Sequence, residues 1–380
     1  MARLNIGLLS AQEQTQEGQV PEVEIDQNNE ALKTDQDMAQ IQQAGSEIEE
    51  ISQVVEETQD ASQAMTSMAD KIEQSETVSQ ETVQVAQEAI AYFVKRTGVK
   101  MTKLNASMES YSKTTDKQVV VEQMRLAVES LDKGVTVAQE GIIDRIQNRF
   151  SLIFTSGKKL AKELEEVSKK YDETGAREEA IKEPAFARRI NPDAKKTLTD
   201  SDVLKLATDI NKKVHNPTVI SSVKKLTEAL QTVTSALKKS GIFVADDKQV
   251  KIIKEQTSNI SSMYNDIESE LGVKRNKNDA DVEPLNPANK EKIVKLVDSL
   301  LDISEYAKYE EILREAQRSM VVALAHSSGM KLAKEQAADN RAVSAANEQA
   351  YEVYAIISNL MALRFEVAHA CVKYIKASTK

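Results

Sequence analysis

The sequence has little of what β-rich or disulfide-stabilised proteins need. Its 380 residues include one cysteine, six prolines and eleven glycines, no tryptophan, and only 4% aromatic side chains. Few turn-forming and few bulky strand-forming residues disfavour a β-rich fold. A single cysteine excludes an intramolecular disulfide and is typical of a reducing compartment. The composition therefore predicts an all-α protein.

Long apolar runs are also missing. No uninterrupted apolar stretch reaches the roughly 18 residues that a helix needs to cross a bilayer. The first residues, MARLNIGLLSAQEQ, contain too short an apolar run for a secretory signal, and no small-residue cleavage site follows them. We therefore expect a chain that is made in the cytoplasm and has no membrane partner.

Motifs for catalysis and for nucleotide or metal binding are scarce too. The chain has no GxxxxGK[ST], GxGxxG, HExxH or CxxC pattern. Its three histidines, His215, His326 and His369, are far apart in sequence. His369 and Cys371 point to different sides of a helix, and we expect a partly buried histidine and a core cysteine. The sequence thus predicts a non-enzymatic protein without catalytic residues, cofactor or metal.

Negative charge is in excess, and it is concentrated at one end. Residues 1–90 carry 3 basic and 19 acidic side chains, a net charge of −16, whereas residues 91–380 carry 47 basic and 41 acidic, a net charge of +6. Such an asymmetry indicates two segments with different roles.

The acidic N-terminal part of the chain, residues 1–109, is called the acidic front. It is predicted to divide into an arm and a helix. Residues 1–37 are rich in Gln and Glu with little to bury, which predicts a disordered arm. Residues 38–109 are predicted to form an acidic, heptad-patterned helix and are a candidate propeptide. From residue 41 to residue 72, apolar or small side chains recur three and four apart, and the same register continues through Glu76 to Phe93, which indicates a seam for a partner helix. Thr, Ser, Ala and Glu occupy its middle, so we expect a weak or conditional contact, such as a homo-oligomer through residues 41–93.

Residues 110–272 are predicted to form a helical body. One helix is expected to end at Gly134, and the next to start near Thr136 and stop at Gly175. A structured loop or linker is expected over residues 176–198.

Two further helix starts have clear signals. Thr199 followed by Asp202 predicts a capped N-terminus, because a hydroxyl and a carboxylate satisfy free N–H groups there. Asn216-Pro217 predicts the next start, since proline suits the first helical position.

The last third is predicted to be separate in character. Residues 273–289 are polar, contain proline and form a candidate linker. Residues 290–380 resemble three helices, and the last, at about 335–377, is apolar over most of its circumference and belongs in the centre of a bundle. The predicted fold is an all-α helical bundle with long amphipathic helices and an acidic, partly disordered N-terminal arm.

Basic side chains gather in one stretch of the body. They are suited to weak, sequence-independent contact with DNA phosphates, although a solvated helix face is the alternative. Aromatic residues are not interleaved with them, so stacking on single strands is not indicated. The candidate DNA-contacting residues are Lys158, Lys159, Lys162, Arg188, Arg189, Lys195 and Lys196.

Triplets of the form small-x-Glu occur near the end of the acidic region. They are either ordinary helix-surface residues or sites at which a protease cuts after Glu109, Glu88 or Glu129. A cut after Glu109 separates residues 1–109, with 7 basic and 20 acidic side chains and a net charge of −13, from residues 110–380, with a net charge of +3. Because an acidic segment repels DNA, its removal favours a body that lies beside DNA.

Four segments between about residues 100 and 200 carry a resemblance. ASMESY (106–111), RLAVESL (125–131), IIDRIQNRFSLIFTSGKKLAKELEEVSKK (142–170) and the connector EPAFARRINPDAKKTL resemble internal head proteins of large tailed bacteriophages. The resemblance implies an acidic propeptide that a prohead protease removes after Glu. It also implies a mature helical body in the virion head, beside other head, core or capsid proteins and packaged DNA.

Two other classes of protein remain open. A coiled-coil interaction protein would keep residues 38–97 as a lasting oligomerisation helix and would not be processed. A helical membrane-remodelling protein or a secreted effector is the third hypothesis.

Overall fold

The computed structural model describes residues 30–75, 79–97, 117–182, 184–191, 195–240, 247–270, 280–327 and 334–380. Over these residues the chain is built from helices, with one short 3-10 segment and two strands of two residues each. The all-α prediction is confirmed. Most of the predicted arm, residues 1–29, lies outside the described residues.

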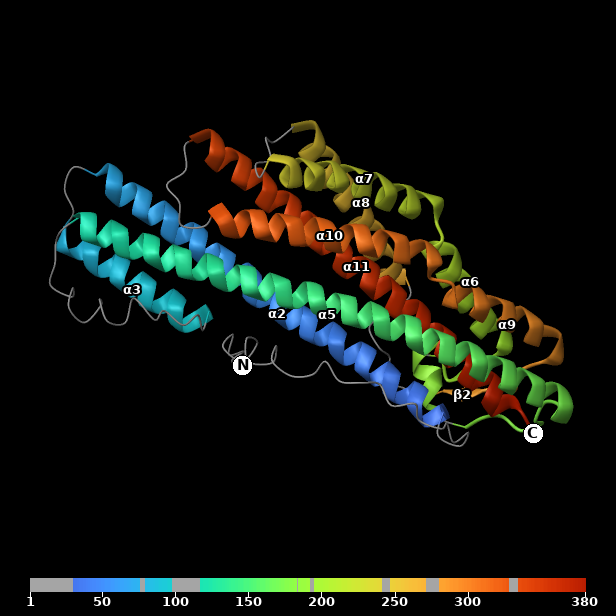
Figure 1. The fold of residues 1–380 in the computed structure, drawn as a ribbon. Helices are drawn as coiled ribbons and strands as arrows, with labels where there is room; N and C mark the ends of the chain where they lie inside the picture. Colours follow the sequence, from blue (N-terminus) through green and yellow to red (C-terminus); the bar gives the residue numbers. More distant parts are fainter. Residues whose placement is uncertain are drawn as a thin grey trace, which may run out of the picture.

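A helical hairpin forms the long axis of the molecule. α5 (Lys117–Thr174), 58 residues long, is its spine, and α2 (Glu30–Gln74) runs beside it along most of its length (Figure 1). The two helices are antiparallel, because Thr34 contacts Glu163 at one end and Glu73 contacts Arg125 at the other. α3 (Gln80–Thr97) packs against both at the Glu73 end.

The heptad-patterned seam of α2 lies against this hairpin partner. Of the ten seam positions from Ile41 to Ile72, all except Ala44 are buried. The apolar seam positions Ile41, Ile48 and Ile51 belong to the same core cluster as Ile142 and Ile146 of α5. The seam predicted from the sequence is therefore satisfied within one chain.

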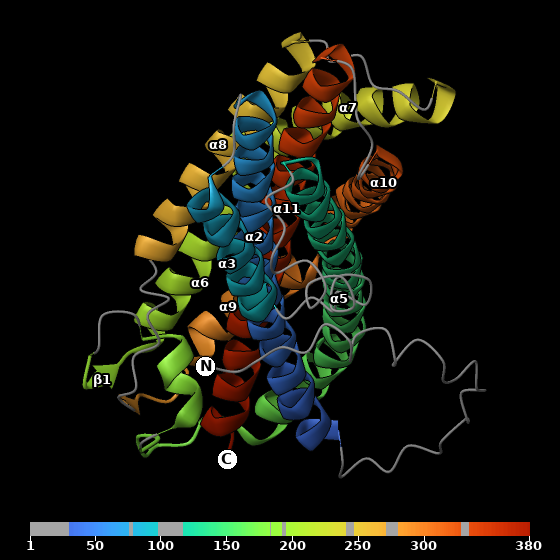
Figure 2. The same ribbon diagram turned by 90° about the vertical axis from the view of Figure 1, so that its left-hand side faces the viewer.

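The remaining helices build the rest of the bundle around α11. In the end-on view of Figure 2, α11 lies in the middle of the bundle, with α8 on one side and α10 on the other. It contacts α2, α5, α6, α8, α9, α10 and the 3-10 segment η2. These elements are η2 (Ala185–Arg189), α6 (Asp200–Val214), α7 (Pro217–Ser240), α8 (Asp247–Glu270), α9 (Pro287–Leu301), α10 (Ser304–Ser327) and α11 (Lys334–Ser378).

The central position of α11 explains its composition. Residues Ala342–Ser378 are long and apolar enough to cross a membrane by length and composition alone, but 72% of the most apolar window is buried inside the bundle. The helix is therefore a core element, as the sequence predicted.

Short strands close one end of the bundle. β1 (Thr197–Leu198) pairs in parallel with β2 (Asp281–Val282), and Ile181 bridges Val282 from the other side. The Tyr374 hydroxyl donates to the Glu283 carbonyl at 2.8 Å, which ties this loop layer to α11. Both predicted connectors, residues 176–198 and 273–289, thus contain described segments that pack against the helices.

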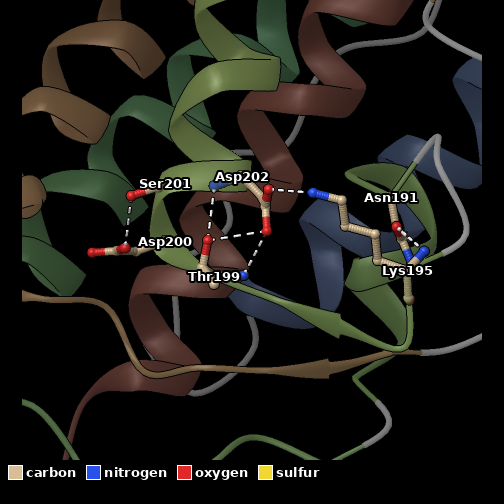
Figure 3. A network of polar contacts seen from close by, with 6 residues as sticks. All are labelled: Asn191, Lys195, Thr199, Asp200, Ser201 and Asp202. Atoms are coloured by element: carbon tan, nitrogen blue, oxygen red, sulfur yellow. Dashed lines mark hydrogen bonds and ion pairs between the residues drawn. The ribbon is translucent and has the colours of Figure 1, made fainter.

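Local helix signals agree with the structure. Thr199 and Asp202 form the predicted capping box of α6, with the Asp202 N–H donating to Thr199 Oγ1 at 3.2 Å (Figure 3). α7 begins at Pro217, and α5 stops before Gly175, whose φ of 79° suits glycine.

Two predicted boundaries are wrong. α5 does not end at Gly134, because the buried neighbours Leu131 and Val135 continue the packed face across it. An interior glycine costs only about 1 kcal/mol relative to alanine, which such packing offsets. The helix of the acidic front starts at Glu30, inside the predicted disordered arm, because Thr34 and Asp37 are held by α5.

The acidic helix is also interrupted. A single helix was predicted over residues 38–109, with its seam from residue 41 to residue 93, but α2 ends at Gln74 and α3 begins at Gln80. At this point the Lys117 Nζ donates to the Ser75 carbonyl at 2.6 Å, which holds the end of α2 against the start of α5.

The core has two parts. A large cluster spans the body, and a smaller distal cluster joins the Gln74 end of α2 to α3 and the start of α5. Polar groups separate them, including Ser62, which donates to Asp132 at 2.5 Å. The distal cluster consists of Ala61, Met65, Ala69, Ile72, Ala86, Ile90, Val120, Val121, Met124, Ala127 and Leu131.

Candidate functional site

The first turns of α2 meet α5 and α11 through charged and polar side chains. Asp37 accepts from the Ser156 hydroxyl at 2.8 Å and pairs with the Lys159 Nζ at 2.9 Å. Asp35 lies 3.0 Å from the Nε2 of His369 and 3.1 Å from the Nζ of Lys373. We call these two aspartates and their partners the clasp.

A buried glutamate completes the clasp. Glu163 of α5 is 7% exposed and accepts from the Thr34 hydroxyl at 3.1 Å. Its other carboxylate oxygen is 3.6 Å from the Nζ of Lys376. Three lysines and one histidine, drawn from two helices, therefore surround the point at which α2 begins.

His369 is a buried titratable group within the clasp. Burial lowers its pKa below the usual value, and the carboxylate of Asp35 opposes that effect. Lys373 lowers the pKa further, whereas Glu163 raises it. The imidazole is consequently favoured in its neutral form at neutral pH.

A buried arginine holds the middle of α2. Arg149 of α5 is 7% exposed and donates from Nε to the Ile41 carbonyl at 3.0 Å. Its Nη1 donates to Asn359 of α11 at 2.6 Å, so three helices meet at one guanidinium. Burial lowers the pKa of Arg149. Gly45 makes room for this group, because a Cβ there would lie 2.8 Å from Nη2.

Three of the predicted DNA-contacting residues have carboxylate partners within the chain. Lys159 pairs with Asp37 in the clasp, and Arg189 pairs with Glu366 at 3.1 Å. Lys195 pairs with Asp202 at 2.5 Å, which lowers the pKa of that carboxyl (Figure 3). Arg188 also has an interaction within the chain.

The other predicted basic residues are more open. Lys162 and Lys196 are exposed, and the Lys158 ammonium lies 4.2 Å from the centroid of the exposed Phe154 ring. Lys158 and Phe154 line a mostly apolar pocket of about 260 Å³ between α5, the α9–α10 corner and α11. The seven residues come from α5, η2 and the β1 connector rather than from one helix face.

The three candidate cleavage residues have different surroundings. Glu109 lies outside the described residues, in the chain between α3 and α5. Glu88 is exposed on α3 and accepts from Gln84 at 3.0 Å. Glu129 is half-buried within α5 and pairs with Lys133 at 2.5 Å. A cut at Glu88 or Glu129 requires local unfolding, since helical backbone is hydrogen-bonded.

Several residues of this region are not apparent from sequence patterns. Asp35 and Asp37 fall in the segment predicted to be disordered, and Lys373 and Lys376 were not among the predicted basic residues. One signal was present: these two lysines stand three residues apart near the end of an otherwise apolar helix, where they mark its outward face. Over the described part of the chain, no group of His, Cys, Asp or Glu residues is arranged to hold a metal ion.

Comparisons with known proteins identify no family for this chain. No protein-family model, no curated protein and no solved structure matches this chain.

Proposed function

We propose that this chain is a non-enzymatic structural protein of a phage virion, an internal head or prohead-core component. In this proposal it is made with an acidic N-terminal segment that a prohead protease cuts, and the helical body stays beside the packaged DNA. The observation that carries the proposal is the separation of charge between paired helices. α2 has 11 acidic and 2 basic side chains, a net charge of −9, whereas α5 has 10 of each.

The packing of α2 gives this processing two steps. A cut after Glu109 separates the segment that holds α2 and α3 from α5, but the buried seam still holds the pieces together. Release then requires α2 to leave α5, which uncovers apolar residues such as Ile142 and Ile146. A head or core partner that covers this face of α5 would make release favourable.

Mass spectrometry of the protein from mature particles tests the proposal. We expect a chain that begins at Ser110, with peptides from residues 1–109 depleted relative to those of the body. A chain that begins at Ala89 or Ser130 instead would assign the cut to Glu88 or Glu129. An intact N-terminus in mature particles would defeat the processing, and absence of the chain from particles would defeat the virion assignment.

A coiled-coil interaction protein that is never processed is the second candidate. One observation favours this candidate: the apolar seam of α2 is buried in the core, so removal of α2 would expose the core residues that pack against it. Because the seam faces α5 of the same chain, a homo-oligomer through residues 41–93 is not needed to bury it. Under this candidate the mature chain keeps its N-terminal segment intact, whereas under the first it is cut after Glu, and mass spectrometry of the mature chain separates the two.

A further inference from the structure

We infer that the first turns of α2 cover a binding site for the phosphates of a nucleic acid, formed by Lys159 of α5 and by His369, Lys373 and Lys376 of α11. The two aspartates of the clasp occupy the positions that phosphate oxygens would take. The inference deepens the proposed function, on which it rests for the choice of DNA as the polyanion.

The geometry of the aspartates resembles that of a bound anion. Asp37 receives a hydroxyl hydrogen bond and an ammonium, and Asp35 lies between an imidazole and an ammonium, all within 3.1 Å. Hydroxyl and lysine groups are also common donors to phosphate. The same side chains are therefore suited to carboxylate or to phosphodiester oxygens.

The contacts that hold the first turns of α2 against α5 and α11 are weak enough for these turns to separate. Met38 is the first apolar side chain in the core among those of α2 whose burial the structure describes. The preceding turn is held by two ion pairs, each with one open and one covered partner: Lys159 is 45% and Asp37 11% exposed, and Asp35 is 54% and Lys373 18% exposed. Because one partner of each pair stays open to water, solvent screens the attraction within it. The start of α2 can thus separate from α5 and α11 while the seam from Ile41 onward stays in place.

The site changes from neutral to positive when the first turns of α2 separate from it. With α2 in place, Asp35, Asp37 and Glu163 balance the three lysines. Without the aspartates, the three lysines face one carboxylate, a local charge of +2, and protonation of His369 adds one more. A site of this sign attracts phosphates in a manner that depends on salt but not on base sequence.

The test uses the full chain and a duplex DNA of mixed sequence. D35N/D37N removes the two carboxylates of the clasp, and E50Q/D70N is the matched control. Glu50 and Asp70 are exposed on the same helix and lie outside the clasp. Both variants raise the net charge by two, so any difference between them reports position rather than total charge.

We expect D35N/D37N to bind the duplex with a Kd roughly tenfold lower than the control at about 0.1 M salt, measured by fluorescence anisotropy. Removing the aspartate partners of Lys159 and Lys373 should steepen the slope of log K against log salt by about 2, one unit for each phosphate contacted. K159Q/K373Q placed in the D35N/D37N background should abolish the gain.

Three outcomes would overturn the inference. The first is an equal gain in E50Q/D70N, which would assign the effect to net charge. The second is no gain in D35N/D37N when circular dichroism shows the helix content unchanged, which would leave the clasp a purely structural contact. The third is a gain for polyglutamate with none for DNA. Because the assay needs neither cleavage nor particles, its failure is distinct from failure of the virion assignment.

Discussion

Gly45 and Arg149 are matched to each other at the junction of α2, α5 and α11. A Cβ at Gly45 would lie 2.8 Å from Nη2 and 3.0 Å from Cζ of Arg149, whose guanidinium is fixed by hydrogen bonds to Ile41 and Asn359. The side chain has little freedom to give way without losing those bonds. Close packing here therefore depends on the absence of one methyl group.

The variant G45A tests this match. Alanine gains about 1 kcal/mol from helix propensity, but overpacking costs about 1–3 kcal/mol. We expect the free energy of unfolding, measured with urea, to fall by about 1 kcal/mol. G141A is the control, because its Cβ would lie 3.5 Å from Arg145 and should raise the free energy of unfolding. Equal stabilisation by both substitutions would contradict the account of Arg149.

His369 predicts a pH dependence. Its pKa in the folded chain is lowered by burial from the value of about 6.5 in unfolded chains, although Asp35 and Glu163 oppose the shift and Lys373 adds to it. The unfolded chain therefore binds more protons as pH falls below about 6.5, and folding stability decreases there. We expect H369Q to show a shallower loss of unfolding free energy than the parent between about pH 7 and about pH 5.5. An unchanged or steeper loss would argue against a buried, neutral imidazole.

At the scale of the element, α6 shows how a helix start is set locally. The Thr199 hydroxyl accepts from the Asp202 N–H, and the Asp202 carboxylate accepts from the Thr199 N–H at 3.0 Å. Both bonds satisfy donors that the helix itself leaves open. Figure 3 shows that Lys195 reaches the same carboxylate from the connector, so the cap also fixes the loop.

T199A removes half of this capping box. We expect thermal or urea unfolding to show a loss of about 1 kcal/mol. S201A is the matched control in the same turn, because Ser201 is exposed and makes only a 3.4 Å hydrogen bond to Asp200. If both variants lose the same stability, the cap contributes nothing beyond a surface hydroxyl.

At the scale of the whole molecule, the two core clusters predict unequal stability along α2. The body cluster holds Ile41, Ile48 and Ile51 against α5 and α11, whereas the distal cluster offers alanines at Ala61 and Ala69. Smaller side chains bury less apolar surface and contribute less stability. The polar contacts between the clusters allow the distal part to open separately.

Hydrogen exchange measured by mass spectrometry tests this difference. We expect amides of residues 61–74 to exchange faster than those of residues 41–55, because the distal cluster opens without global unfolding. M124A, in the centre of the distal cluster, should speed exchange in residues 61–74 and leave residues 41–55 unchanged. Uniform protection along α2 would mean that the bundle opens only as one unit.

Local interactions account for what was predicted well. The capping box at Thr199, the proline start of α7, the glycine stop after α5 and the seam of α2 each depend on residues within one or two turns of each other. The same applies to α11, whose apolar circumference predicted a central helix. Such signals are visible in one sequence because helix geometry brings near neighbours together.

The boundaries and the candidate site depended on distant contacts. Gly134 is typical of a helix end, and only packing against other helices keeps α5 continuous through it. Likewise, Asp35 and Asp37 belong to an ordered helix because lysine side chains more than a hundred residues away hold them.

The amino-acid sequence by itself determined the helical class, the acidic front and the apolar seam of α2, since composition and short-range periodicity govern these. Only the tertiary structure decided that this seam pairs with α5 of the same chain. It also decided that two aspartates near the start of α2 lie against basic side chains of α5 and α11. The physical reason is that a seam specifies the need for a partner, while the identity of the partner depends on which distant surfaces the folded chain brings within contact.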